Sequence, residues 1–343
     1  MEAVGKNVVE IIIDGKNVTG DVSRYLSGIN YTDRLEYESD DISLSFEDTL
    51  GKWQSAWYPS QGDSLQVKIG RPGRFLDCGV FEIDEIELEL SPDTLTVKAL
   101  AASIKKSLRT KESKAFEEQT LWSIAKYFAD KHKFRIVGEQ GALEKIAIDR
   151  KTQERQTDLS FLSNLAKDYG YALSLHWDTL YFTDKAQLES RKAILTIPRS
   201  VMSNARFRDK TSEIYNGVVV NRRDGKKNKN TEWKIMSGKE GEGDILVLEE
   251  DVENEQQALA IGKAKLNDKK REKYSGSLTV PGNTKLVAGI NIELTGVGKF
   301  SGKWHIISST HTIDPSGGYT TGVEIRKILG LTFDRFGNLY TAV

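Results

Sequence analysis

One strand–turn–strand pattern occurs twice in this chain of 343 residues, and its two copies lie far apart in the sequence. The first copy covers residues 62–83 and the second covers residues 289–306. Matching positions near the end of each copy are 223 residues apart: Gly79 and Gly302, Phe81 and Trp304, and Ile83 and Ile306. Two copies are too few for a solenoid, which needs about three stacked repeats. The repeat therefore predicts two similar β domains in one polypeptide, so that three chains can supply the six members of a ring.

Length and charge exclude several classes of protein. A chain of this length is expected to form two or three domains. It carries 49 Lys and Arg against 50 Asp and Glu, whereas proteins that bind mainly DNA phosphates have a basic excess. No apolar run approaches the about 20 residues that span a bilayer, and no signal peptide opens the chain. We therefore expect no membrane association, no direct binding of nucleic acid and synthesis in the cytoplasm.

The period of the apolar residues divides the chain into parts. Within a first domain of residues 1–100, residues 8–100 alternate with the two-residue period of strands, and Asp14-Gly15 between two apolar runs is a hairpin signal. Because polar side chains occupy the outward positions, each strand buries one face, which predicts a small antiparallel β-barrel. Residues 101–192 predict an inserted α+β module with two helices, the first capped by Thr120 and the second ending at Gly170.

Strands return in residues 193–328, which predict a second β-barrel interrupted by one helix that begins after Asn254. The fold class predicted from the sequence is thus mainly β, with two similar tube-like barrels flanking a two-helix module. Residues 329–343 form a C-terminal tail with the pattern of one more strand, beginning at Leu331.

The sequence contains little that suggests catalysis. His132 follows Lys131 at a predicted helix end, where a solvated imidazole is the expected state. His305 and His311 are six residues apart on one strand, and an even spacing predicts that both face the same side. A metal site needs at least one further ligand, and the single Cys78 provides neither a disulfide nor a cysteine cluster. No nucleotide-binding loop or nucleophile elbow is present. We therefore predict no enzymatic activity and no cofactor.

The strongest local charge feature is the basic run at residues 221–230. Its five cationic residues are Arg222, Arg223, Lys226, Lys227 and Lys229, which are candidate contacts to a tail tube or another protein partner. The alternative is a solvated hairpin tip, in which Asp224-Gly225 supplies the turn.

Several motifs resemble those of the phage late control D-type tail hub proteins. The C-terminal segment 311–326, in which His311 precedes Gly-Tyr-Thr-Thr and an alternating strand, is similar to the signature of that family. Further similar segments lie at residues 14–19, 38–46, 62–63, 81–84 and 258–289, and their order extends the resemblance from about residue 8 to residue 328.

This resemblance implies a structural hub of a contractile tail or a related injection particle. Such hubs are similar to the N-terminal part of type VI secretion spike proteins, and they form trimers in which two tube-like domains per chain make a pseudo-six-fold ring. The implied partners are other copies of the chain, the spike protein, the tail tube protein and other baseplate proteins. The implied location is the virion tail baseplate or injection particle, assembled in the bacterial cytoplasm.

Two other readings remain open at this point. One is a tail-associated cell-wall hydrolase, which would need acidic residues or a histidine gathered in a cleft. The other is a carbohydrate-binding β protein, which would be a monomer in solution. The sequence alone does not distinguish a phage from a bacteriocin or an injection system.

Overall fold

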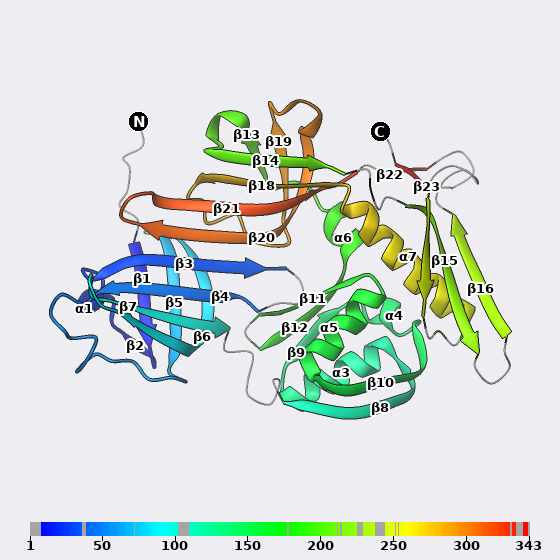
Figure 1. Cartoon of the computed structure of the whole chain (residues 1–343), viewed down its shortest axis with the longest axis horizontal. Helices are drawn as coiled ribbons and strands as arrows, with labels where there is room; N and C mark the ends of the chain where they lie inside the picture. Colours follow the sequence, from blue (N-terminus) through cyan, green and yellow to red (C-terminus); the bar gives the residue numbers. More distant parts are fainter. Residues whose placement is uncertain are drawn as a thin grey trace.

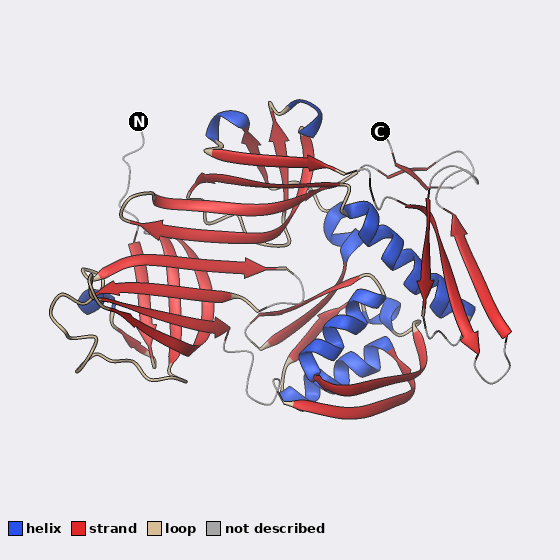
Figure 2. Ribbon diagram, in the orientation of Figure 1, coloured by secondary structure: helices blue, strands red, loops and turns tan. Residues whose placement is uncertain are grey.

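The chain folds into a mainly β structure, which confirms the mainly β part of the predicted class (Figures 1 and 2). In this computed structural model the described residues are 8–35, 39–71, 73–101, 110–176, 178–210, 212, 215–224, 229–236, 244–250, 252, 254–329, 331–333 and 339–341. They contain three separate hydrophobic cores.

The N-terminal core is enclosed by strands and one short helix. These elements are β1 (Val8–Ile13), β2 (Lys16–Asn17), α1 (Thr19–Val22), β3 (Leu26–Arg34), β4 (Asp41–Glu47), β5 (Ser64–Arg71), β6 (Arg74–Glu89) and β7 (Thr94–Ala101). In β4 every second residue is buried, and Ile42, Leu44 and Phe46 are each 1% exposed. The turn at Asp14-Gly15 has positive φ at both residues and joins the paired β1 and β2, so the hairpin signal is confirmed.

The middle of the chain is an α+β unit. Its elements are β8 (Lys111–Thr120), α3 (Leu121–His132), β9 (Arg135–Gly138), α4 (Gln140–Leu143), β10 (Ala147–Thr157), α5 (Asp158–Asp168), β11 (Tyr171–His176), β12 (Thr179–Asp184) and α6 (Lys185–Ser190). Thr120 caps α3 by accepting a hydrogen bond from Ser123 N, and Gly170 follows the end of α5 with a φ of 79°. Both helix-end predictions are confirmed.

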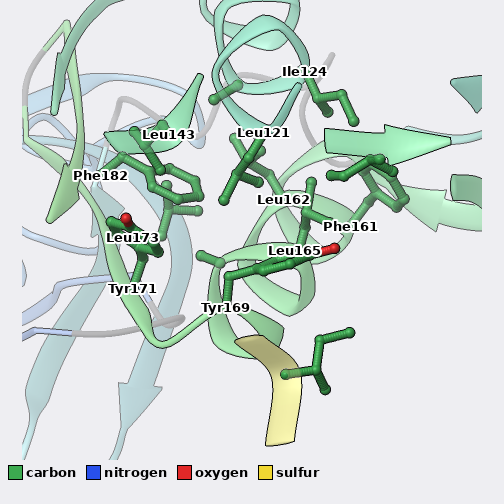
Figure 3. Packing of buried hydrophobic residues seen from close by; sticks show 14 of the residues in the cluster. Leu121, Ile124, Leu143, Phe161, Leu162, Leu165, Tyr169, Tyr171, Leu173 and Phe182 are labelled. Carbon is green, nitrogen blue, oxygen red and sulfur yellow. The ribbon is translucent and has the colours of Figure 1, made fainter. Parts of the chain in front are cut away.

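Figure 3 shows the side chains of α3 and α5 meeting over β11 and β12, with Leu121, Leu162 and Phe182 among those that converge. A second sheet and the longest helix share this core: β15 (Tyr215–Asp224), β16 (Lys229–Met236), β17 (Asp244–Glu249) and α7 (Glu255–Arg271). Asn254 caps α7 through Gln257 N, as expected. Gly262 lets α7 lie close to β15, because a Cβ there would approach side-chain atoms of Val220 and Val218 at 3.0 and 3.2 Å.

The third core lies in the C-terminal part of the chain. It is enclosed by β13 (Leu195–Pro198), the 3₁₀ turn η1 (Arg199–Val201), β14 (Asn204–Asp209), β18 (Tyr274–Pro281), β19 (Asn291–Thr295), η2 (Gly298–Phe300), β20 (Gly302–Asp314) and β21 (Gly318–Lys327). The tail holds two short paired strands, β22 (Leu331–Phe333) and β23 (Leu339–Thr341), rather than the one that was expected.

The N-terminal and C-terminal strands join in one sheet of 13 strands. Its path runs β14-β18-β21-β20-β3-β4-β7-β6-β5-β1-β2, and β13 and β19 branch from β20. Figure 1 shows β3 and β20 side by side where the two groups of strands meet. The sheet is therefore continuous across two cores that the sequence separates by the whole middle unit.

Candidate functional site

The candidate site is the junction between two sets of strands with the same connectivity. We call β1 and β3–β7 the first repeat unit, and β13, β14 and β18–β21 the second repeat unit. The long strand of each unit, β6 or β20, pairs with the strand before it (β5 or β19) and the strand after it (β7 or β21). The last strand, β7 or β21, also pairs with β4 or β18, which in turn pairs with β3 or β14. The first strand, β1 or β13, pairs with β5 or β19. One pairing differs in direction, because β1 lies antiparallel to β5 whereas β13 lies parallel to β19.

Finer details of the two units also correspond. Gly79 in β6 and Gly302 at the start of β20 both have positive φ, at 101° and 118°. The next aromatic residues, Phe81 and Trp304, are 1% and 0% exposed. Each long strand then has a register shift just after an isoleucine, between residues 83 and 85 in β6 and between 306 and 308 in β20. A bulge at matching positions is a strong sign of a common substructure, because bulges have a specific local geometry.

The junction itself is the antiparallel pair of β3 and β20. Residues 29–34 of β3 pair with residues 313–308 of β20. At its centre Tyr31 lies opposite His311, with ring centroids 6.0 Å apart and planes inclined by 20°. Both side chains are buried, at 4% and 0% exposure, so the two repeat units share a closed interface inside one chain.

His311 organises the buried hydrogen bonds of this junction. Its Nε2 lies 3.0 Å from the carbonyl oxygen of Leu286, which can only accept, so Nε2 carries the proton. Nδ1 then accepts from the hydroxyl of Tyr319 at 2.8 Å. Burial lowers the pKa of His311 to about 4, so the ring is neutral at pH 7. The family-like segment that begins at His311 is therefore a set of packing and hydrogen-bonding groups.

A serine lies beside this histidine without the geometry of a nucleophile. Ser309 Oγ donates to the Leu286 carbonyl at 2.6 Å, and the ring nitrogen nearest to it, Nε2 of His311, is the protonated one. A general base would need to accept from the hydroxyl. Since Ser309 and His311 are both fully buried, this pair stabilises the segment that carries Leu286.

Two acidic side chains lie at the edge of the same junction. Asp33 Oδ2 accepts from Ala288 N at 2.8 Å, and Asp40 Oδ1 accepts from Arg34 N at 2.9 Å. Burial, followed by the charge of Asp33, raises the pKa of Asp40 to about 7. Together with Tyr31 and Cys78 they line a cavity of about 230 Å³. Asp33 thus connects β3 of the first unit to the loop before β19 of the second.

A different cluster attaches the middle unit to the second repeat unit. Asn291 Nδ2 donates to carbonyl oxygens at the end of α6, at 2.9 Å from Leu188 and 2.7 Å from Arg191. His305 Nδ1 lies 2.6 Å from Asn291 Oδ1 and fixes the orientation of that amide. Burial and then the charge of Arg271 lower the pKa of His305 to about 4.

Ion pairs reinforce this attachment. Arg271 at the end of α7 donates to both carboxylate oxygens of Glu189 in α6, at 2.6 and 3.2 Å. Lys185 of α6 reaches Asp268 of α7 at 3.2 Å. Such two-oxygen contacts hold an arginine in a fixed geometry. The two helices therefore form one rigid connection beside the sheet, next to a polar cavity of about 560 Å³ lined in part by Arg34 and Arg326.

Two predictions about histidines were wrong. His132 is buried at 5% exposure, and its Nε2 lies 2.8 Å from Asp158 Oδ2, because α5 begins directly beside the end of α3. Burial alone would raise the pKa of Asp158, but hydrogen bonds from Lys131, Gln153 and His132 hold it below its usual value. His305 and His311 lie on opposite faces of β20, because the bulge after Ile306 reverses the alternation between them.

The basic run joins two paired strands. β15 and β16 pair from Gly217↔Met236 to Asp224↔Lys229, and the described side chain of Arg222 is half-buried. Lys226 and Lys227 lie outside the described residues, as do the side chains of Arg223 and Lys229. The predicted role of these five residues as partner contacts stays a prediction.

The described part of the chain has neither a metal-binding cluster nor a membrane-spanning helix. It holds no group of three or more His, Cys, Asp or Glu side chains placed to bind a metal ion. Nor does it contain a helix of sufficient length and apolar character to cross a membrane.

Sequence reasoning missed the buried acids Asp33 and Asp40 and the amide of Asn291. Asp40 is directly followed by Asp41, but nothing in the local pattern indicates that it is buried. Their partners lie in distant segments: Ala288 is 255 residues from Asp33, and Leu188 is 103 residues from Asn291. No short-range signal could have identified them.

Comparisons with known proteins agree on one family. A family model described as phage tail baseplate hub (GPD) matches residues 80–317. The probable baseplate hub protein of Escherichia phage 186 is 24% identical over 92% of this chain and 91% of its own length. That of Escherichia phage P2 is 28% identical over 61% of this chain, and the match spans only about half of the P2 protein, 54%.

Solved structures share the fold. The 43 kDa tail protein of prophage MuSo2 from Shewanella oneidensis has a TM-score of 0.71 at 16% identity, covering 93% of this chain and 98% of its own. A type VI secretion system component from E. coli, described as similar in structure to bacteriophage T4 tail proteins, has a TM-score of 0.58 at 11% identity. It covers 93% of this chain and 76% of its own.

Proposed function

This chain belongs to the phage tail baseplate hub (GPD) family, and we propose that it acts as a trimeric adaptor that joins a hexameric inner tube to a three-fold spike. The observation that carries this proposal is the repeated connectivity of the two units within one chain. Three chains with two similar units each present six near-equivalent positions toward a six-fold tube. The same three chains present three equivalent positions toward a spike.

A structural role in a tail baseplate follows from the family, and we propose a role for each part of the chain. Each repeat unit is a tube-like barrel domain, in residues 1–100 and 193–328, and residues 101–192 form the inserted module. Within the second stretch, β15–β17 and α7 pack in the core of the module. The rigid connection through Arg271 and Glu189 would then hold the module at a fixed position on the outside of the ring.

The proposed partners are further copies of this chain, the spike, the tube and neighbouring baseplate proteins. The location of the assembled protein is a tail baseplate or injection particle, built in the bacterial cytoplasm. A type VI secretion component with the same fold supports a spike as a partner, because such systems and phage tails share the fold of this chain.

The two alternatives have weaker support. A hydrolase needs an accessible nucleophile or acid pair, whereas Ser309 and His311 are fully buried. The His311 nitrogen nearest to Ser309, Nε2, carries a proton, so it cannot accept one from the serine hydroxyl. A carbohydrate-binding protein needs no ring, so it would remain a monomer.

Multi-angle light scattering of the purified chain, alone and mixed with its spike, tests the proposal. A mass that is a three-fold multiple of 38.4 kDa is expected. A complex that contains one copy of the chain per spike would exclude the adaptor.

A further inference from the structure

Two stretches of strand edge in the long sheet have no partner strand among the described residues. β14 is the last strand of the path and pairs only with β18 among the described strands. On β6, one edge pairs with β7 through Glu89, but the other edge pairs with β5 only as far as Glu82. On this second edge Ile83 also bonds to Gly62 and Asp63 of the loop before β5, and beyond Ile83 no described strand covers it. Exposed backbone edges of this kind are templates for pairing with another chain.

The corresponding edge in the second repeat unit is covered. There β19 pairs with the start of β20, from Gly302 to His305, and β3 then continues along the same edge from Ser308 to Ile313. The opposite edge of β20 is occupied by β21. The pairing of β3 with β20 is therefore one complete example of a strand contact, and the corresponding edge of β6 has no such partner strand within the described chain.

The register of the missing contact can be read from the filled one. A row of directly paired residues crosses each unit: Ile83, Ala99, Ile42 and Tyr31 in the first, and Ile306, Ile325, Gly276 and Phe207 in the second. Each residue of β20 thus corresponds to the residue of β6 whose number is 223 lower, as Ile306 corresponds to Ile83. Each residue of β3 corresponds to the residue of β14 whose number is 176 higher, as Tyr31 corresponds to Phe207. The strand that should cover β6 is therefore β14, which corresponds to β3.

We propose that β14 of one chain pairs antiparallel with residues 85–90 of a second copy, in the register that β3 and β20 use within one chain. The contact places Phe207 opposite Leu88, as Tyr31 lies opposite His311. It rests on the proposed ring and identifies the strands that close it. Each chain offers one edge of each kind, so successive copies join head to tail, and a suitable rotation closes the ring.

Charge complementarity supports this register. The free edge of β6 carries Glu85, Glu87 and Glu89, whereas β14 carries Arg206 and Arg208, all exposed. Lys98 of β7 already contacts Glu85 and Glu87 at 3.2 and 3.0 Å, so one lysine is shared by two of the three carboxylates. The register taken from the β3–β20 pair sets Glu87 opposite Arg208 and Glu89 opposite Arg206. Directly opposite residues of an antiparallel pair lie on the same face, where opposite charges stabilise the pairing.

Apolar residues match on the other face. Leu88, near the end of β6, and Leu90, just beyond the strand, are 42% and 66% exposed. The register sets them opposite Phe207, which stacks on Phe300 with centroids 5.2 Å apart, and Ala205. Pairing would remove this apolar surface from water. Asp209 meets Ile86, and its carboxylate is already neutralised by Lys299 at 2.7 Å.

The partner must be another chain. Within one molecule β14 and β6 are seven strands apart along the sheet, and Figure 1 shows strands β18, β21, β20, β3 and β4 lying between them. A contact between them therefore reports on a second copy.

Disulfide trapping tests the register. In the full chain, Glu89→Cys with Arg206→Cys places two cysteines directly opposite one another, and mild oxidation should give covalent dimers and trimers on a denaturing gel. The control variant, Glu85→Cys with Arg206→Cys, shifts one cysteine by four residues, about 13 Å, which exceeds the about 7 Å that a disulfide can bridge. The buried Cys78 is common to both variants. Covalent oligomers should be at least about tenfold more abundant in the matched variant.

Charge exchange gives a second measurement without cysteines. Glu87→Arg should lower the oligomeric fraction several-fold in light scattering, and adding Arg208→Glu should restore it. Lys145→Glu, at an exposed position far from both edges, should change nothing.

The outcomes separate this contact from the proposed adaptor. Equal crosslinking in both cysteine variants, or crosslinking in neither, overturns the contact, even if the unmodified chain has a three-fold mass and the adaptor stands. Selective crosslinking of the matched variant supports the contact, and the mass of the unmodified chain then decides independently whether three copies close the ring.

Discussion

Tyr31 and His311 lie directly opposite one another in adjacent strands and stack at 6.0 Å, although they belong to the two ends of the chain. This pair closes a sheet that runs through both repeat units. The hydrogen bonds around it give a common role to a histidine of β20 and two residues of β21, since Tyr319 and Thr321 both contact the ring of His311.

Replacing His311 by alanine should destabilise the chain. The Leu286 carbonyl and the Tyr319 hydroxyl would lose a buried partner, and a buried polar group without a partner costs about 1–3 kcal/mol. Urea unfolding monitored by fluorescence measures the loss. Thr312→Ala, at the neighbouring half-buried position with one long hydrogen bond, is the control and should cost much less. Equal stability of the two variants would contradict the role assigned to His311.

The pH dependence of stability should reveal Asp40. Because the folded chain raises the pKa of Asp40 to about 7 from 3.8, this carboxyl holds a proton in the folded state at pH values where the unfolded chain has released it. Its contribution is therefore fully present below pH 3.8 and is lost as the pH rises through 7. Asp40→Asn keeps the Oδ1 acceptor for Arg34 N and removes the titration. The stability of this variant relative to the unmodified chain should rise between pH 5 and pH 8, and an unchanged difference would exclude the effect.

Trp304 should be a central core residue of the second repeat unit. It is fully buried and donates from Nε1 to the Phe300 carbonyl at 2.8 Å. Trp304→Ala should cost roughly 3–5 kcal/mol in the free energy of unfolding. Val201→Ala, at a residue that is 43% exposed, is the control. A loss below about 1 kcal/mol for the tryptophan variant would be incompatible with its burial.

Deleting residues 226–230 tests the basic run. The deletion shortens the tip of the β15–β16 hairpin, so the chain should keep its fold and its oligomeric mass while tube polymerisation on it is impaired. Electron microscopy of tubes grown from the purified hub measures the effect. Normal tube growth on the shortened chain would mean that the run is only a solvated turn.

Local features of the fold could be predicted from the sequence because their causes are local. Thr120 and Asn254 cap helices through residues three positions away, and Asp14-Gly15 forms its turn alone. The two repeat units could be recognised in the sequence because Phe81 and Trp304 are both buried after a turn glycine, and the residues around them keep the same spacing.

The remainder depends on contacts between distant segments. His132 is buried because Asp158, 26 residues later, begins α5 beside it. His305 and His311 face opposite sides because of one inserted residue, whose bulge breaks the two-residue period that the prediction used. Val218 and Ala258 pack in the core of the middle unit although the second repeat unit surrounds them in sequence order. The acidic edge of β6 and the basic edge of β14 could be matched only after the strand registers of the two repeat units were compared in the structure.

The rotational symmetry of the assembled particle is the most direct test of the adaptor. Class averages of the purified oligomer viewed along its axis should show a closed ring of six similar lobes with three-fold symmetry, two lobes for each chain. A ring of two or four chains, or a particle with only one lobe per chain, would contradict it.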